Sequence, residues 1–319
     1  MVLKIFGGTD EKEKRRGTKV IPNARAALEE NCFHNKYLLY CGKSWGHLRP
    51  NERRAKAKST ALKLHANNFQ SFQITVAGVG LAVRAPDRVA GMVASWVNSA
   101  QKTARTRYTI SIRPAHDTAY RSGNAKDMNL IHRLSLTSNS IDLEIDAEDT
   151  PTISAALGYG LSVALSLNKG LLLHASGVLL DGKAYVFVAP SGGGKSTVIR
   201  HCRKGTCLHD DKIAIAWHEN EWMTGSTPLL DNRGRVPQPK QAPCGGIFVL
   251  LKARKTALDV PPSHTLLDEI ASLAYEPTEL KWVRKNLLQN ILEMIGDVPI
   301  GLLRYKKGDD VAGLVKSFG

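Results

Sequence analysis

The chain has few cysteines and no long uninterrupted apolar run. Its five cysteines are an odd number and include no C-x-x-C pair, which is typical of proteins in a reducing cytoplasm. The longest apolar stretch, residues 153–167, is shorter than the roughly 20 residues needed to span a bilayer. The N-terminal apolar segment is too short for a signal peptide. We therefore expect a cytoplasmic protein without a membrane span.

Acidic residues are also scarce, since 29 Asp and Glu face 44 Lys and Arg, a net charge of +15. Residues 1–68 contain fifteen of the basic and only six of the acidic residues. The basic run 43–63 has a single aromatic residue, Trp45, and no recognised nucleic-acid motif, which favours a solvated helix or arm over a nucleic-acid partner. The spacing of Cys32, His34, Cys41 and His47 matches none of the usual zinc sites.

The length of 319 residues suits about two domains after this basic segment. Residues 69–150 predict a small α+β domain of mostly antiparallel strands, with one hairpin around Ala77-Gly78 and a second over 130–145. Between them, apolar residues at helical spacing predict a helix over 89–100, and a strand follows at 108–112. Residues 151–319 predict an α/β nucleotide-binding domain.

The second domain begins with a buried helix over 153–167, for which Thr150 is the predicted N-cap and Pro151 lies in the first turn. A strand over 171–180 follows and carries His174. Asp181-Gly182 turns this strand into the next one, 184–188. Later strands are predicted at 213–217, 221–224, 247–251 and 298–305, and helices at 266–275 and 279–295.

A phosphate loop follows the strand 184–188. The sequence Ala189-Pro-Ser-Gly-Gly-Gly-Lys-Ser-Thr197 leads into a helical segment, so that strand, glycine turn and helix stand in the order that polyphosphate binding requires. Ala189 replaces the first glycine of G-x-x-x-x-G-K-[ST], which requires a negative φ there. The predicted nucleotide-binding residues are Ala189, Ser191, Gly192, Gly193, Gly194, Lys195, Ser196 and Thr197. The Ser196 hydroxyl is the predicted ligand of Mg²⁺.

Two adjacent carboxylates, Asp210 and Asp211, follow the next short strand. A phosphate-loop enzyme supplies its metal-ordering carboxylate from such a position, and the second carboxylate is free to accept the proton of an acceptor hydroxyl. His174 lies on the strand that the hairpin places beside the one entering the loop, within reach of the phosphates or of a carboxylate. Arg233 and Arg235 lie in a loop near the site, either as a phosphate clamp or as solvent-exposed turn residues.

These segments together resemble the HPr serine kinase family. The resemblance runs through Leu-Leu-His174-Ala-Ser-Gly-Val, the phosphate loop with Lys195 and Ser196, and Leu-His-Asp210-Asp211. It covers about 141–319 and, loosely, 72–146. It implies an α/β phosphate-loop kinase domain of the HPr kinase-like or PEP carboxykinase-like type, preceded by the small α+β domain and the basic N-terminal segment.

The resemblance also implies ATP-dependent phosphorylation of a serine hydroxyl on a peptide or small protein, with ATP and Mg²⁺ as cofactors. By this analogy Lys195, His174 and Asp210 are catalytic, Asp210 is the base, and Asp211 joins Ser196 at the Mg²⁺. From the sequence alone the roles of the two carboxylates are interchangeable. Thr197 stands where bifunctional members carry an acidic residue, so phosphorylase activity is not implied. A homo-oligomer is allowed but not required.

Two other functions fit the same motifs. One is a kinase for the hydroxyl of a free amino acid or metabolite, and the other is a non-catalytic switch protein that binds ATP or GTP. A transporter ATPase does not fit, because no L-S-G-G-Q-like segment follows the loop.

Overall fold

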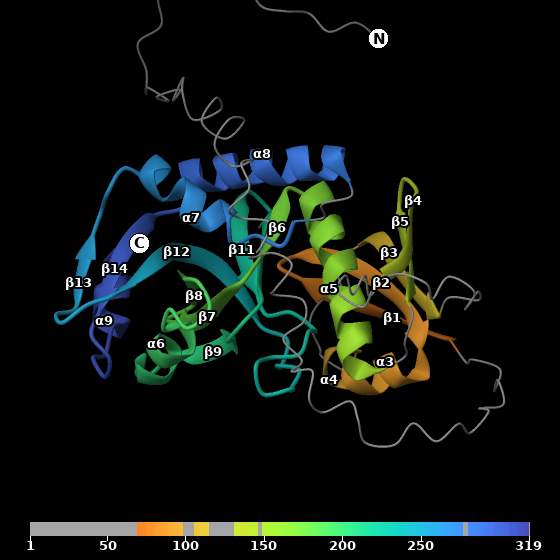
Figure 1. Ribbon diagram of the computed structural model, residues 1–319, viewed down its shortest axis with the longest axis horizontal. Helices are drawn as coiled ribbons and strands as arrows, with labels where there is room; N and C mark the ends of the chain where they lie inside the picture. The colour runs from red at the N-terminus through yellow and green to blue at the C-terminus, as the bar shows by residue number, and fades with distance from the viewer. Residues whose placement is uncertain (1–68, 98–104, 115–130, 146–148, 277–279, 319) are drawn as a thin grey trace, which may run out of the picture. The chain divides into compact units, whose positions relative to one another are not determined.

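The structure is a computed structural model that describes residues 69–97, 105–114, 131–145, 149–276 and 280–318. The basic segment 1–68, with the four residues considered for zinc, lies outside this part, and so does Ala100 at the end of the predicted helix face. The described residues all belong to one compact unit, Asn35–Gly319, of mixed α/β structure. Figure 1 labels most of its helices and strands.

A first sheet has the strand order β1-β2-β3-β5-β4. Its strands are β1 Phe69–Val76, β2 Val79–Pro86, β3 Thr106–Pro114, β4 Ile131–Leu136 and β5 Ser140–Ile145. Both predicted hairpins are present, and Ala77 and Gly78 have the positive φ angles (49° and 81°) of a tight hairpin turn. However, β2 pairs with β3 and β3 with β5 in parallel. The prediction of mostly antiparallel strands was therefore wrong, because the alternation of side chains is the same for both directions.

The helix predicted after Pro86 is interrupted. It forms α3 Asp87–Met92 and α4 Ala94–Val97, with Val93 between them at φ −104° and ψ 14°. Trp96 in α4 donates its indole N–H to the carbonyl of Pro237 at 2.8 Å. This contact ties the first sheet's helices to the loop that precedes β12.

The helix α5, Thr150–Leu167, packs against β3 and β5 of the first sheet and against β6 and α8. Asp149, not Thr150, is its N-cap, because the Asp149 carboxylate accepts the N–H of Thr152 at 2.8 Å. By length and composition α5 is the one helix among the described residues that is able to cross a membrane, yet 78% of its apolar window is buried. It is therefore a core helix.

Among the described residues, nine strands form a second sheet, in which β6-β10-β11-β12-β8-β7-β9 are neighbours, β14 pairs with β12, and β13 pairs with β14. The strands are β6 Gly170–Leu173, β7 Ala175–Leu180, β8 Lys183–Val188, β9 Thr206–His209, β10 Ile213–His218, β11 Glu221–Gly225, β12 Gln241–Lys252, β13 Ala257–Asp259 and β14 Ile300–Tyr305. The predicted strand 171–180 is divided at His174, because β6 pairs with β10 whereas β7 pairs with β8 and β9.

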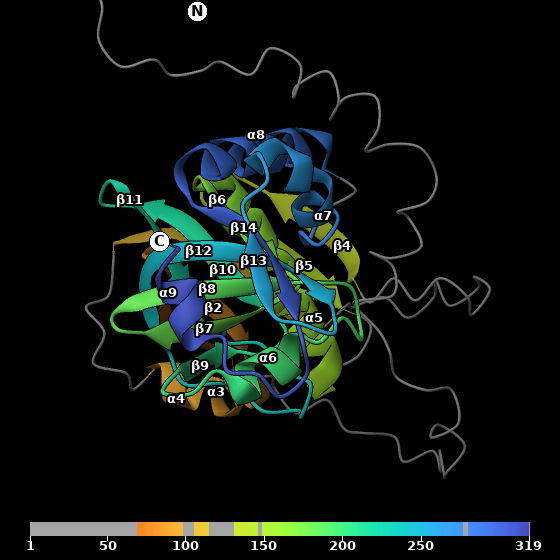
Figure 2. The ribbon, with the colours of Figure 1, turned by 90° about the vertical axis from the view of Figure 1, so that its left-hand side faces the viewer.

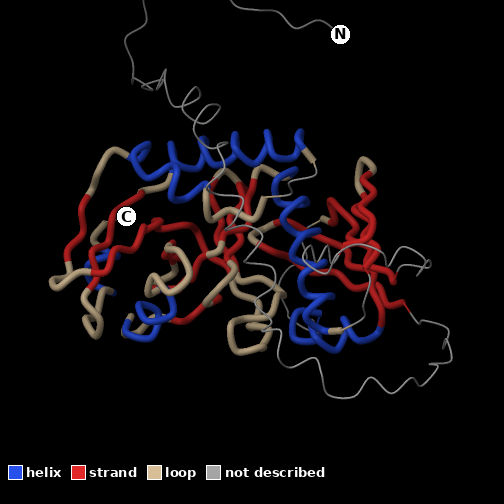
Figure 3. The backbone as a smooth tube through the Cα atoms, in the orientation of Figure 1, coloured by secondary structure: helices blue, strands red, loops and turns tan. Residues whose placement is uncertain are grey.

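The remaining helices lie along the second half of the chain. They are α6 Lys195–His201, the 3-10 helix Ser263–Leu266, α7 Leu267–Ala271, α8 Lys281–Asp297 and α9 Ala312–Lys316. The helix predicted over 266–275 is shorter than expected and is preceded by the 3-10 turn, while α8 matches the prediction closely. Figure 2 and Figure 3 show α6 beside β7 and β9, joined to β8 by a loop.

Candidate functional site

The order of the strands brings the predicted site residues to one edge of the second sheet. Strand β7 is antiparallel to both β8 and β9, and Ala175 lies opposite Val188 while Gly177 lies opposite His209. The beginning of β7 therefore meets the ends of β8 and β9. His174 precedes β7, the phosphate loop follows β8, and the two carboxylates follow β9, so all three segments are neighbours (Figure 2).

The segment predicted as a phosphate loop connects Val188, the last residue of β8, to Lys195, the first of α6. Gly192 and Gly194 have φ angles of 77° and 106°, which favour glycine strongly. Gly193 is needed for a different reason, because a Cβ there would lie 2.5 Å from that of Ala189. Ala189 is buried and does not have a positive φ, so alanine fits where the motif usually has glycine. Gly192 and Gly194 are thus explained by their backbone conformation, and Gly193 by the close packing within the loop.

Lys195 is folded back onto this loop, with only 6% of the residue exposed. Its ammonium donates to the carbonyl of Ala189 at 2.7 Å, to Nε2 of His174 at 3.0 Å and, more weakly, to the carbonyl of Pro190 at 3.4 Å. Burial lowers the pKa of Lys195 to about 8, although the negative charge of Asp211 acts in the opposite direction. The lysine is therefore a buried cation held by two backbone carbonyls of the loop and by His174.

His174 connects the lysine to the carboxylates. Its Nε2 faces Lys195, and its Nδ1 lies 3.0 Å from Oδ1 of Asp211. This second contact is not aligned as a hydrogen bond, so it is a close electrostatic contact. The His174 backbone N–H donates to the carbonyl of Leu273 at 2.7 Å, which holds the residue at the junction of β6 and β7.

Asp211 is 7% exposed and has a cationic or polar partner on each oxygen. His174 faces Oδ1, and the Lys212 ammonium contacts Oδ2. Burial acts to raise the pKa of Asp211, but His174 and Lys212 outweigh it and hold the pKa well below its usual range. Asp211 is therefore ionised near neutral pH.

Asp210 differs from its neighbour. It is half-buried, and its carboxylate has one polar contact among the described residues, a long one of 3.4 Å from the N–H of Asn232. Burial raises the pKa of Asp210, and the charges of Asp231 and Asp211 add to this effect against the Asn232 contact. Asp210 is consequently the more basic carboxylate and has an oxygen available to a ligand.

The residues on either side of the carboxylate pair were not predicted as site residues. His209 is buried, and its Nδ1 accepts the N–H groups of Asp211 and Lys212 at 3.1 Å each, while Nε2 donates to the carbonyl of Leu229 at 3.2 Å. Burial lowers the pKa of His209 to about 4, so the ring is neutral near pH 7. The two flanking residues are His209 and Lys212. The contiguous sequence His-Asp-Asp-Lys is the signal that could have pointed to them.

The two candidate arginines lie in a tight turn that begins at Asp231. Arg235 pairs with the Asp231 carboxylate at 3.2 Å, and the backbone N–H of Arg233 donates to the same carboxylate at 2.8 Å. Both arginine residues are exposed. The turn does adjoin the site, because Asn232 contacts Asp210, but neither arginine makes a hydrogen bond or ion pair with Asp210 or Asp211 within the described part of the chain.

The predicted magnesium ligands were tested against the side chains present. No group of three or more His, Cys, Asp or Glu residues suited to a metal occurs among the described residues. Magnesium at a nucleotide site needs fewer protein ligands, since phosphate oxygens and water complete its coordination beside one or two protein oxygens. The half-buried Ser196, whose hydroxyl has no hydrogen bond to the described residues, and the ionised Asp211 provide that chemistry. Lys212, however, already contacts Oδ2 of Asp211.

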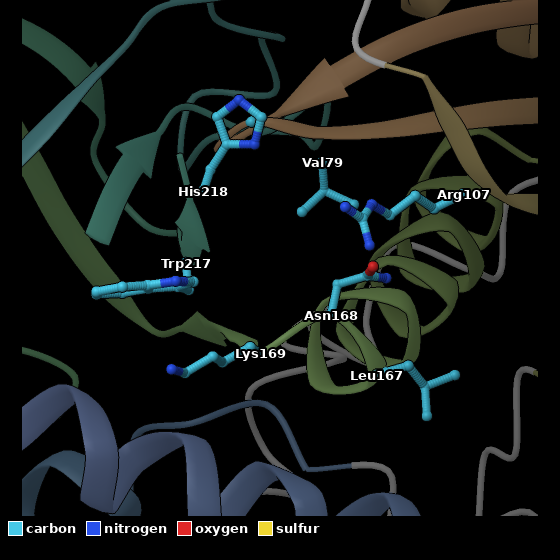
Figure 4. Close-up of a pocket in the computed structure, with 8 residues that line it drawn as sticks. Val79, Arg107, Leu167, Asn168, Lys169, Trp217 and His218 are labelled. Atoms are coloured by element: carbon cyan, nitrogen blue, oxygen red, sulfur yellow. The ribbon is translucent and has the colours of Figure 1, made fainter. Parts of the chain in front are cut away.

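A separate cavity of about 280 Å³ lies at the opposite end of the β6–β10 pair. Figure 4 shows Arg107 extending over Asn168 towards Val79, and Lys169 beneath Trp217. The Lys169 ammonium lies 4.4 Å from the ring centre of Trp217 and 2.9 Å from Oε2 of Glu293. None of the predicted site residues lines this cavity, so it is distinct from the phosphate loop. Its lining is Gly78, Val79, Arg107, Leu167, Asn168, Lys169, Trp217 and His218.

Comparison with known proteins adds little to this geometry. No protein-family model and no curated protein sequence matches the chain. Among solved structures, the chain is similar to the Hpr(Ser) kinase/phosphatase from Coxiella burnetii, with 13% sequence identity, 46% of this chain and 87% of that chain covered, and a TM-score of 0.25. A TM-score this low does not establish a shared fold.

Proposed function

We propose that this chain is an ATP-dependent kinase that transfers the γ-phosphate to a serine-type hydroxyl of a peptide or small protein. The observation that carries the proposal is the continuous contact from Lys195 through His174 to Asp211. It links the phosphate loop to the carboxylate pair across two strand junctions. A glycine turn and a neighbouring Asp-Asp pair occur separately in many proteins, but the buried Lys195 and Asp211, joined by the partly buried His174, indicate one chemical centre.

The loop and Lys195 would bind the triphosphate. Gly192, Gly193 and Gly194 leave the backbone of the loop open to an anion, and the Lys195 ammonium is able to exchange its carbonyl partners for phosphate oxygens. His174 then keeps the lysine directed at the loop. Ser191, Ser196 and Thr197 belong to the same predicted nucleotide-binding set and are at least partly accessible.

Asp210 is the proposed base. In the transfer step the acceptor hydroxyl oxygen forms a bond to the γ-phosphorus, the bond between that phosphorus and the β–γ bridging oxygen breaks, and the hydroxyl proton goes to Asp210. ADP is the leaving group. The raised pKa and accessible oxygen of Asp210 suit it to this role, whereas the lowered pKa of Asp211 suits a carboxylate that stays charged.

Ser196 and Asp211 would hold Mg²⁺. When bound, the ion supplies positive charge that stabilises the transferring phosphoryl group. The half-exposed position of Asp210 and the exposed Ser191 leave the centre open to solvent, which supports an acceptor hydroxyl carried on a larger molecule.

Transfer of labelled γ-phosphate from ATP tests this proposal. The purified full chain is incubated with a cell extract and ATP, and intact-mass spectrometry detects acceptors that gain about 80 Da, the mass of one phosphoryl group. Lys195→Ala and Asp210→Asn should abolish the transfer, while the exposed-site controls Lys285→Ala and Glu221→Gln should label like the parent. Equal labelling by the parent and both site variants would disprove the assignment.

The same experiment separates the two alternative functions. Labelling of a free amino acid or metabolite without any protein acceptor would indicate a small-molecule kinase. Tight binding of nucleotide by the parent but not by Lys195→Ala, with neither transfer nor hydrolysis, would indicate a non-catalytic switch protein.

A further inference from the structure

Lys212 follows the carboxylate pair directly and is mostly buried, with 16% of its side chain exposed. Its ammonium contacts Oδ2 of Asp211 and donates to the carbonyl of Leu230 at 3.1 Å. Because His174 faces the other oxygen, neither oxygen of Asp211 is without a close partner. The positive charge at this carboxylate is therefore supplied by the chain itself.

The backbone of Lys212 is held by two hydrogen bonds that do not involve its ammonium. Its N–H donates to Nδ1 of His209 at 3.1 Å, and its carbonyl accepts the hydroxyl of Thr227, also at 3.1 Å. The four-carbon side chain can move the ammonium by rotation alone, without disturbing these two hydrogen bonds. Asp211 and Lys212 thus form a pair in which one partner is fixed by its neighbours and the other is movable.

We propose that Lys212 is a built-in counter-ion that competes with a divalent cation for Asp211. The inference rests on the proposed function and concerns the order in which metal and nucleotide bind. In the free protein the Lys212 ammonium occupies the oxygen that a metal needs, and two cations at one carboxylate oxygen repel each other. Metal alone therefore binds weakly. A bound triphosphate offers the ammonium another anionic partner and releases Asp211, so metal and nucleotide bind together.

Metal binding without nucleotide is the direct test. Mn²⁺ is titrated into the full chain, and the free ion is followed by electron paramagnetic resonance. Lys212→Gln removes the charge but keeps a donor for the carbonyl of Leu230, and Lys212→Met removes both. Both variants should bind Mn²⁺ at least about tenfold more tightly than the parent, because the competing charge is gone. Lys212→Arg keeps the charge and should bind as weakly as the parent.

Controls separate this effect from a change in net charge or in folding. Lys285→Met alters the net charge equally at an exposed position of α8 and should leave Mn²⁺ affinity unchanged. Thermal unfolding of each variant checks that the fold persists, and Lys212→Gln serves if Lys212→Met does not fold. In the parent, added ATP should raise Mn²⁺ affinity more than it does in Lys212→Gln.

The two proposals fail in different ways. If the parent transfers phosphate but Lys212→Gln binds Mn²⁺ no more tightly than the parent, the counter-ion inference is wrong and the kinase proposal stands. If the parent binds no nucleotide even with Mn²⁺ present, the kinase proposal is wrong and the inference that rests on it is lost as well.

Discussion

The ammonium of Lys195 lies 3.0 Å from Nε2 of His174, although 21 residues separate them in the chain. The contact exists because β7 and β8 form an antiparallel hairpin whose open end carries His174 on one side and the phosphate loop on the other. A lysine and a histidine in contact share their environment, so changing either one alters the electrostatics of both.

Nucleotide affinity should decrease at alkaline pH. Burial brings the pKa of Lys195 to about 8, so above that pH the side chain loses the charge that attracts phosphate. The dissociation constant for ATP should then rise by up to about tenfold per pH unit. Lys195→Arg stays protonated and should show little change over this range. Fluorescence titration with ATP between about pH 7 and pH 9.5 measures the dissociation constant. A dissociation constant of the parent that does not change with pH would contradict the prediction.

Removing the His174 side chain should impair transfer more than binding. His174→Gln loses the contact with Asp211 and weakens the support of Lys195. The turnover rate should fall by about 10- to 100-fold, the usual effect of losing a residue that orients a reacting one. His264→Gln, at an exposed position, is the control. Steady-state rates with ATP measure the turnover of both variants. A turnover rate of His174→Gln equal to that of the parent would exclude a role of His174 in the transfer step.

The phosphate loop should not tolerate a methyl group at Gly193. A Cβ there would lie 2.5 Å from the Cβ of Ala189 and 2.9 Å from the carbonyl oxygen of Pro190. Gly193→Ala should therefore displace the loop, at a cost of about 1 to 3 kcal/mol, and weaken ATP binding. Adding Ala189→Gly removes the first clash and should restore part of the affinity.

Gly296→Ala is the matched control for this series. It places a methyl group in α8 with no atom within 4 Å, so it should leave ATP binding unchanged and stabilise the fold by up to about 1 kcal/mol. Calorimetric titration with ATP compares the three variants with the parent. Full affinity in Gly193→Ala would show that the loop has more room than the structure indicates.

The stability of the fold should decrease as the pH falls from 6.5 to about 4. The pKa of His209 drops from 6.5 in the unfolded chain to about 4 in the fold, so in this range only the unfolded state binds the proton. The contribution amounts to about 3 kcal/mol when complete. Urea unfolding across this range should show a smaller pH dependence for His209→Gln than for the parent. The same dependence in both proteins would refute the prediction.

Local features of the fold could be predicted from the sequence because they depend on neighbouring residues. The hairpin turns at Ala77-Gly78 and Asp181-Gly182 require positive φ angles, and the structure has them at all four positions. A tight turn between β8 and α6 was expected from its glycines, and Gly192 and Gly194 there have positive φ angles. The N-cap of α5 was misplaced by one residue, because Asp149 and Thr150 are both good caps and only the backbone conformation chooses between them.

Features that depend on distant partners were not predictable in the same way. The strand 171–180 has a continuous apolar pattern, yet it divides at His174 because its two halves pair with different strands. The parallel pairing of β2, β3 and β5 leaves no local mark, since side chains alternate identically in both directions.

By itself, the sequence determined where the glycines, the lysine and the paired carboxylates stand, and these residue types led to the prediction of a phosphate-binding and proton-accepting site. Only the tertiary structure decided that Lys195, His174 and Asp211 are in contact, and that Lys212 already neutralises Asp211 while Asp210 remains accessible. The reason is physical: burial and neighbouring charges set the pKa of each group, and both arise from segments brought together by strand pairing.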